Sequence, residues 1–297
     1  MINNKKSAVK SVSSLWLGSM FGSGSTFVIY IILARELGTE NFGLFASILS
    51  MATIFTILAD FGVSQFWLKI FGKDGWNGVR WISPSLRFLF FVIVIVLALF
   101  SIWTLWGPHD KVTRQILFVM SFFILSRVSV NLVSSKLQLE EKYVKLALWQ
   151  LLPNLSRLII IAVMVYIATL NINVHYVAWI YAMVGMVFIS LGIYQIYQMK
   201  NGEFDLKGHK KIDSQHQNIP LIRNVFSESW PFGMASIFAF VYVQSDIIMV
   251  KYIAGNTQAG YYNVAYVIIK SILVFPTVLY QKYFLPKYHR WANHNRK

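Results

Sequence analysis

The sequence predicts an all-α protein, a polytopic transmembrane helix bundle of about eight spans, and three observations lead to this fold class. The composition is too apolar for a water-soluble globule. Eight runs of apolar residues are each long enough to cross a bilayer, which takes about 20 residues. Basic residues are abundant in every second connection between these runs, as they are around membrane helices.

The composition separates the chain from soluble domains. Of its 297 residues 56% are apolar and 13% are charged, and they include 23 Phe, 15 Tyr and 10 Trp. A soluble domain has about 45–50% apolar and about 25% charged residues, so the excess apolar surface needs lipid as its solvent. The net charge of +15 could serve nucleic-acid binding, but the basic residues lie between apolar runs. We therefore expect no nucleic-acid partner.

The eight runs are expected to be helices, because backbone groups in lipid must be satisfied within each segment. Their length and uniform apolarity do not fit barrel strands, which alternate and span about ten residues. In chain order the predicted spans are Ser13–Leu33, Phe42–Phe66, Leu86–Trp106, Ile116–Ser135, Leu146–Leu170, Val174–Tyr197, Val225–Val250 and Gly260–Tyr280.

The distribution of Lys and Arg predicts the orientation. Twenty of the 27 basic residues lie in the N-terminal arm, the even-numbered connections and the tail, and four lie in the odd-numbered connections. By the positive-inside rule both termini are then cytoplasmic. The predicted location is the bacterial inner membrane. A polar stretch within residues 201–224 is expected to be a cytoplasmic linker between a six-span N-terminal lobe (1–200) and two further spans with a basic cytoplasmic tail (225–297).

An internal repeat supports this division. Gly38 and Gly43 lie between the first two spans, and Gly255 and Gly260 lie between the seventh and eighth. Both pairs have the pattern Gly-x4-Gly followed by two bulky apolar residues. Glycine at such a connection permits a positive φ and close helix packing, so we interpret both motifs as tight hairpins of a duplicated bundle.

These two hairpins also carry a family resemblance. The segment from Leu33 to Gly43, with Ala34-Arg35-Glu36-Leu37-Gly38, resembles the first hairpin of the polysaccharide transporter family. That family includes the O-antigen and exopolysaccharide flippases of the multidrug/oligosaccharidyl-lipid/polysaccharide exporter superfamily. The stretch from Ser245 through Gly255, Gly260 and Tyr261 is similar to the hairpin that opens the family's second lobe. The resemblance covers the whole chain in layout.

The resemblance implies a function and a larger architecture. Members translocate undecaprenyl-diphosphate-linked oligosaccharide repeat units of O-antigen or a related surface polysaccharide, and they have twelve or more spans in two lobes. This sequence has about eight, so we expect an incomplete second lobe. The implied partners are the lipid-linked oligosaccharide, membrane lipid and polysaccharide polymerase machinery.

Three basic residues fall inside predicted spans: Arg127, Arg157 and Lys270. A charged residue at mid-span costs ~2.5–3.5 kcal/mol on insertion scales, so each is expected to face protein or a water-filled cavity. Snorkelling toward a helix end is the alternative. A cavity lined by guanidinium groups suits a diphosphate, whose oxygens accept bidentate hydrogen bonds from arginine. We therefore predict that these three residues bind the anionic head group.

Two acidic residues are candidates for an ion pair or for a coupling cation: Asp246, late in the seventh span, and Asp60, late in the second. For Asp246 an interfacial position partly in water is the alternative. For Asp60 the favoured interpretation is a feature of the helix end, just before Phe61-Gly62.

Two other functions fit the sequence less well. A drug/cation antiporter of the same superfamily would have acidic residues in the first-lobe cavity, where this chain has Arg127 and Arg157. A membrane polysaccharide polymerase would need a sizeable outer loop for its active site, and the outer loops are short. With no cysteine and no pair of histidines at metal-ligand spacing, we expect no metal, no cofactor and no catalytic residue.

Overall fold

A computed structural model describes residues 2–167, 171–206 and 219–278, and within these ranges all regular structure is helical. The side chains of residues 2–12 and of Lys270 are outside the described part. The helices are α1 Ile2–Asp60, α2 Val63–Asp74, a 3-10 helix Gly75–Trp81, α3 Ile82–Trp106, α4 Lys111–Leu139, α5 Tyr143–Ala162 followed by a π-helical turn Val163–Ile167, α6 Val174–Lys200, α7 Ile222–Ala254 and α8 Asn256–Val278. The predicted all-α class is confirmed.

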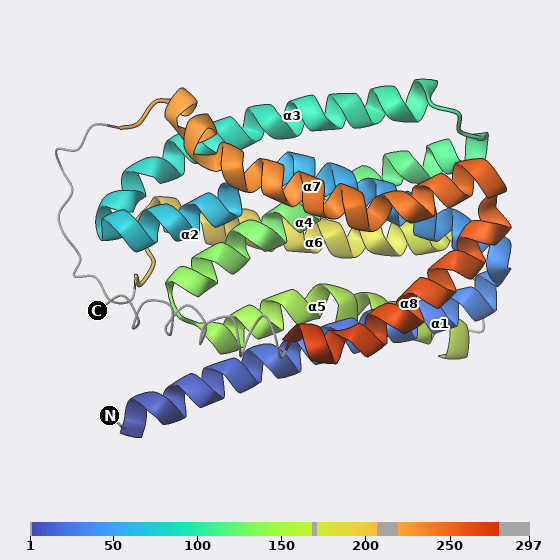
Figure 1. Ribbon diagram of the computed structural model, residues 1–297, viewed down its shortest axis with the longest axis horizontal. Helices are drawn as coiled ribbons and strands as arrows, with labels where there is room; N and C mark the ends of the chain where they lie inside the picture. Colours follow the sequence, from blue (N-terminus) through green and yellow to red (C-terminus); the bar gives the residue numbers. More distant parts are fainter. Residues whose placement is uncertain (1, 168–170, 207–218, 279–297) are drawn as a thin grey trace.

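The long helices run roughly along one direction and form a bundle (Figure 1). We call one end of the bundle the basic end; it holds the start of α1, the α1–α2 joint at Phe61-Gly62, the start of α3 and the end of α6. We call the other the hairpin end; it holds Gly38, the α3–α4 connection and Gly255. The predicted connections therefore alternate between the two ends as the sequence indicates.

The first two predicted spans form α1, which bends sharply at Gly38 (φ 72°, ψ 169°). The helix begins at Ile2, eleven residues before the predicted first span. The second arm ends at Asp60 and not at the predicted Phe66, because Phe61 (φ 41°) and Gly62 (φ 73°) leave the helical region. Asp60 therefore lies at a helix end, as its sequence context favours.

A short helix that was not predicted follows this break. α2, Val63–Asp74, buries Val63, Phe66, Trp67 and Ile70 on one face. Lys69 and Lys73, two of the basic residues counted in the second connection, lie on this helix. The apolar spacing of three and four residues from Val63 onward is the helical pattern that would have identified it.

Four stretches of the described residues are long and apolar enough to cross a membrane: Ser13–Trp106, Lys111–Leu139, Tyr143–Tyr166 and Val174–Lys200. The first of these contains three predicted spans, in the two arms of α1 and in α3. The predicted seventh and eighth spans coincide with α7 and α8, of 33 and 23 residues, which are long enough at 1.5 Å per residue to cross but are not among the four stretches. Their crossing stays a prediction.

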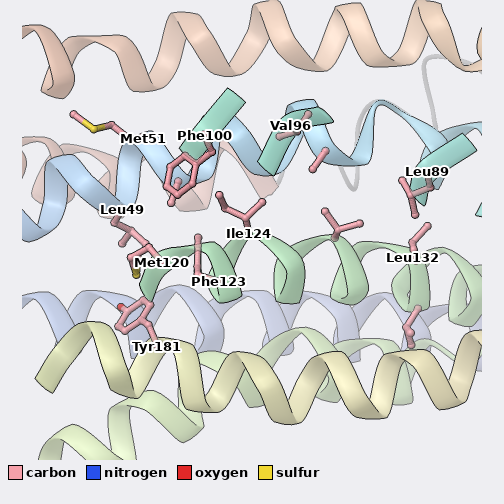
Figure 2. Packing of buried hydrophobic residues seen from close by; sticks show 14 of the residues in the cluster. Leu49, Met51, Leu89, Val96, Phe100, Met120, Phe123, Ile124, Leu132 and Tyr181 are labelled. Carbon is pink, nitrogen blue, oxygen red and sulfur yellow. The ribbon is translucent and has the colours of Figure 1, made fainter. Parts of the chain in front are cut away.

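The apolar core lies along α4, which packs against α1, α5 and α6. Figure 2 shows Met120, Phe123 and Ile124 of α4 among side chains from α1, α3 and α6. The Phe123 and Tyr181 rings lie 5.9 Å apart. Large apolar side chains on the opposite faces are exposed, as lipid contact requires; Phe90, for example, is 63% exposed.

The two repeated hairpins contact each other, and they do so reciprocally. Gly38 and Gly255 share an unusual backbone conformation (φ 72°, ψ 169° and φ 95°, ψ 174°), which only glycine adopts readily. A Cβ on Gly43 would overlap the carbonyl oxygen of Asn256, and a Cβ on Gly260 would overlap that of Thr39. Thr39 and Asn256 follow the first glycine of their own motif, so the contact has the symmetry of the repeat. We call it the Gly43–Gly260 crossing.

A second close crossing joins α7 to the α1–α2 joint at the basic end. A Cβ on Gly62 would come within 2.5 Å of the Gly233 nitrogen, and one on Gly233 within 3.0 Å of the Phe61 oxygen. Nearby, Lys69 forms a half-exposed ion pair with Glu228 at 2.7 Å. The N-terminal helices thus contact α7 at the basic end and α8 at the hairpin end.

The alternation of the two ends gives a topology prediction. Because the chain has no cysteine, each single-cysteine variant carries one label site. In intact cells a membrane-impermeant maleimide should label Glu40→Cys and Lys111→Cys at the hairpin end. It should label Lys73→Cys and Lys142→Cys at the basic end only after the membrane is permeabilised. Labelling of Lys142→Cys in intact cells at the same rate as Lys111→Cys would contradict the orientation.

Candidate functional site

A polar cavity of about 280 Å3 lies between the first arm of α1, α4 and α5. Most of its lining side chains are small or polar, although these helices otherwise expose apolar surface. The lining residues are Gly18, Ser19, Gly22, Ser23, Thr26, Arg127, Val130, Asn131, Ser134, Gln150 and Asn154. A polar space of this size among membrane-spanning helices can hold water or a phosphate-sized group.

Helical periodicity brings these residues to one place. On α4, Arg127, Asn131 and Ser134 are four and three residues apart, and so lie on one face of the helix. On α5, Gln150 and Asn154 are four apart, and Gln150 Nε2 donates to Ser134 Oγ at 3.3 Å. This hydrogen bond ties the two polar faces together across the cavity.

The α1 wall is made of residues without bulky side chains. Gly22 has open space where a Cβ would stand, and it faces the cavity with Ser19, Ser23 and Thr26. Gly18, also in the lining, packs against α5, where a Cβ would lie 2.7 Å from the Ala147 Cβ. The small residues therefore let α1 approach α5 while they keep room beside Arg127.

Arg127 is the cationic group of the cavity. It lies near the middle of α4 (Lys111–Leu139), is half-buried, and lines the cavity directly. Among the described residues it forms no ion pair and no hydrogen bond with another side chain. A guanidinium group without a partner in a polar cavity can donate several hydrogen bonds to an anion.

Arg157 lies behind the cavity wall and does not line it. It is 3% exposed, and its Nη1 donates to Asn154 Oδ1, at 3.2 Å, which does line the cavity. Its guanidinium carbon lies 4.4 Å from the centre of the Tyr181 ring and 5.3 Å from that of Phe123. Its Nε is buried with no hydrogen-bond partner.

The two guanidinium groups are within electrostatic range of each other and of the Tyr30 and Tyr181 hydroxyls. No carboxylate lines the cavity. The four ion pairs among the described residues involve neither arginine. The site therefore has an excess of positive charge without an internal counter-ion, and it is complementary to an anion.

Of the other predicted site residues, Asp60 and Asp246 do not line this cavity. Lys270 belongs to α8, and its side chain is outside the described part. Asp60 is buried at the basic end and accepts a hydrogen bond from Ser64 Oγ at 2.6 Å. Asp246 is exposed on α7 and accepts one from Tyr262 Oη at 3.0 Å. Neither carboxylate pairs with a described basic side chain, and a coupling role for either stays a prediction.

A separate polar contact closes the hairpin end next to the Gly43–Gly260 crossing. The Tyr252 hydroxyl and His109 Nδ1 are hydrogen-bonded at 3.0 Å, which joins the end of α7 to the α3–α4 connection. Burial lowers the pKa of His109, and the neighbouring charge of Lys251 lowers it further. Both effects favour the neutral imidazole, and its protonation in acid would place a second positive charge beside Lys251.

The sequence predicted a cavity position for Arg127, which the structure shows, and for Arg157, which lies behind the wall. The polar residues around them were not predicted. On each helix these polar residues lie one turn from an arginine or from each other: Asn131 and Ser134 follow Arg127 on α4, and Gln150 and Asn154 precede Arg157 on α5. Polar residues at this spacing inside predicted spans were the available indication. That α1, α4 and α5 enclose one space could not be read from spacing alone.

Fold and site together define a helical membrane protein with a cationic cavity between its helices. The sequence profile of the polysaccharide biosynthesis protein family matches residues 8–286, and the chain belongs to this family. The chain is also similar to an uncharacterized membrane protein of Methanocaldococcus jannaschii, with 22% identity over 279 residues, 89% of this chain and 63% of the relative.

A solved structure, that of a chain called protein A, shares the fold. Its TM-score is 0.62 at 15% identity, over 91% of this chain and 61% of that one. The chain thus spans less than two-thirds of the length of both the relative and this structure. Members of the family take part in polysaccharide biosynthesis, and the cationic cavity has to be understood in that context.

Proposed function

We propose that the chain is part of a flippase that translocates undecaprenyl-diphosphate-linked oligosaccharide repeat units, of O-antigen or a related surface polysaccharide, across the inner membrane. The observation that carries the proposal is the cavity between α1, α4 and α5 with Arg127 unpaired inside it. Family membership supplies the link to polysaccharide biosynthesis. The proposal places the basic end in the cytoplasm.

The chemistry of the substrate explains why the cavity is cationic. A diphosphate loses its hydration when it enters the hydrocarbon core, and fixed guanidinium groups can replace that hydration with charge-assisted hydrogen bonds. Arg127 is free to contact a phosphate oxygen directly. Asn154, held by Arg157 Nη1, offers its amide nitrogen as a second donor. The lipid tail stays in the bilayer while the head group passes.

The cavity disfavours the related antiporter function. A drug/cation antiporter needs carboxylates that release a proton or bind a cation. The carboxylates of Asp60 and Asp246 lie outside the cavity lining, and each already accepts a hydrogen bond from a hydroxyl. We therefore infer a transporter of anionic lipid-linked substrates, and not a cation exporter.

Arg127→Ala tests the proposal in cells that depend on the protein for their surface polysaccharide. We expect lipid-linked repeat units to accumulate on the cytoplasmic face and polymer output to fall about tenfold or more, since a hydrogen bond to a charged group contributes ~1.5–3 kcal/mol. Arg127→Lys should restore output only in part, because an ammonium keeps the charge without the planar fork. Polymer and precursor are measured at matched protein levels.

Arg35→Ala is the matched control. Arg35 has a side chain that is 74% exposed at the hairpin end, beside Glu36, and its removal should leave polymer output unchanged. Normal output from Arg127→Ala at normal protein level would show that Arg127 does not carry the head group.

A further inference from the structure

A groove of about 350 Å3 lies between α3 and α6 at the basic end. Its lining residues are Ser83, Leu86, Arg87, Phe90, Phe91 and Lys200. Arg87 is in the first two turns of α3, and Lys200 is the last residue of α6. Two exposed basic side chains from different helices thus line the same groove, and the rest of its lining is mostly apolar.

The groove has no role in the proposed transport route. α3 and α5 lie on opposite sides of the bundle in Figure 1, and Arg127 lines a cavity that involves α5 and not α3. Neither Arg87 nor Lys200 takes part in the four ion pairs of the described residues. No carboxylate lines the groove, so an anion that enters it meets positive charge only.

The apolar part of the groove continues along the membrane-facing side of α3. Phe90 and Phe91 are 63% and 56% exposed, and Val94 and Ile95, one turn further, are 49% and 58% exposed. The two phenylalanine rings pack edge to face, with centroids 5.9 Å apart. This surface offers a path for an acyl chain that runs from the basic end toward the middle of the bundle.

We propose that this groove binds one anionic phospholipid of the surrounding leaflet, with its phosphate between Arg87 and Lys200 and an acyl chain along Phe90, Phe91 and Val94. Basic pockets between membrane helices at this depth bind acidic lipid head groups. The Ser83 hydroxyl lies in the same lining and can donate to a phosphate oxygen. The bound lipid ties α3 to the end of α6.

Native mass spectrometry and thermal unfolding of the purified full chain in detergent test the proposal. Phosphatidylglycerol or cardiolipin should stay bound and raise the melting temperature of the native protein, whereas phosphatidylcholine should do neither. In the double variant Arg87→Gln/Lys200→Gln, apparent affinity for phosphatidylglycerol should fall roughly 30-fold, since each basic residue contributes ~1 kcal/mol near an anionic surface.

The double variant Lys73→Gln/Lys145→Gln is the control, because both lysines are exposed at the basic end outside the groove and the charge change is the same. It should keep the native affinity. Equal loss in both double variants would mean general surface attraction and would overturn the site. Tighter retention of undecaprenyl diphosphate than of phosphatidylglycerol in the groove would assign it to the substrate and also overturn the proposal.

Two further results keep the test decisive. If the double variant is not recovered in folded form, Arg87→Gln and Lys200→Gln are measured singly, and each should weaken binding about fivefold. Unchanged affinity in both would contradict the site. Polymer output of cells should respond to Arg127→Ala whether or not the groove binds lipid, so failure of the lipid site and failure of the proposed transport are distinguishable.

Discussion

Gly43→Ala should destabilise the protein by ~2–3 kcal/mol and lower its melting temperature by roughly 4–12 °C. The added Cβ would overlap the Asn256 carbonyl oxygen and would lie 2.5 Å from the Gly260 nitrogen and 2.9 Å from its Cα. These are backbone atoms, so no side-chain rotation relieves the overlap and the α1–α8 contact has to open. The measurement is thermal unfolding of the purified protein in detergent.

Gly24→Ala is the matched control in the same helix. Gly24 is exposed and has open space where its Cβ would stand, so alanine there should be neutral or stabilising by up to about 1 kcal/mol through helix propensity. Gly43→Ala and Gly260→Ala together should cost less than the sum of the single changes, because both act on one crossing. Equal melting temperatures for the Gly43 and Gly24 variants would show that the crossing is not close-packed.

The crossing also has a functional consequence. It holds the two repeated hairpins against each other at the hairpin end, while the Gly62–Gly233 contact and the Lys69–Glu228 ion pair hold α7 at the basic end. If the chain transports as proposed, contacts of this kind would have to open on one side at a time, as in transporters built from duplicated helix bundles. Glycine contacts can separate without breaking specific side-chain bonds, which suits a surface that must close repeatedly.

Much of the fold could be predicted because lipid imposes simple rules. The long apolar runs and the alternating basic connections identified helices that the structure confirms, with errors at their ends. The predicted end of the second span at Phe66 lies beyond the observed break at Phe61-Gly62, because Val63, Phe66 and Trp67 continue the apolar run into α2. Hydropathy alone does not distinguish a span from a short buried helix that follows it.

The repeat shows what sequence patterns leave undetermined. Gly-x4-Gly predicted two hairpins, and the positive φ of Gly38 and Gly255 agrees with that. The contact of Gly43 with the backbone of the other hairpin depends on how α1 and α8 are rotated about their axes. Residue spacing within one helix does not determine this rotation. For the same reason the sequence predicted cavity lining for Arg127 and Arg157 alike and did not distinguish Arg127, which lines the cavity, from Arg157, which is buried behind Asn154.

Arg157→Met should abolish most transport and yet leave the protein as stable as the native form, or more stable. Arg157 is 3% exposed and its Nε is unpaired. Burial of a charge without an ion pair is costly, so an apolar side chain of similar length should not lower the stability. Methionine fills the space between Tyr181 and Phe123. It cannot donate to Asn154 Oδ1, so the amide loses its fixed orientation and the cavity loses half of its positive charge. Melting temperature in detergent and polymer output in cells measure the two effects.

Lys145→Met, on the same helix, is the control for removal of a positive charge elsewhere on α5. Lys145 is exposed near the start of α5, so its replacement should change neither stability nor output. Arg157→Lys should recover little transport, because an ammonium does not stack on Tyr181 as the guanidinium does at 4.4 Å. A clear fall in the melting temperature of Arg157→Met, with normal output per folded molecule, would instead assign Arg157 to packing, and the positive charge that attracts the head group would then come from Arg127 alone.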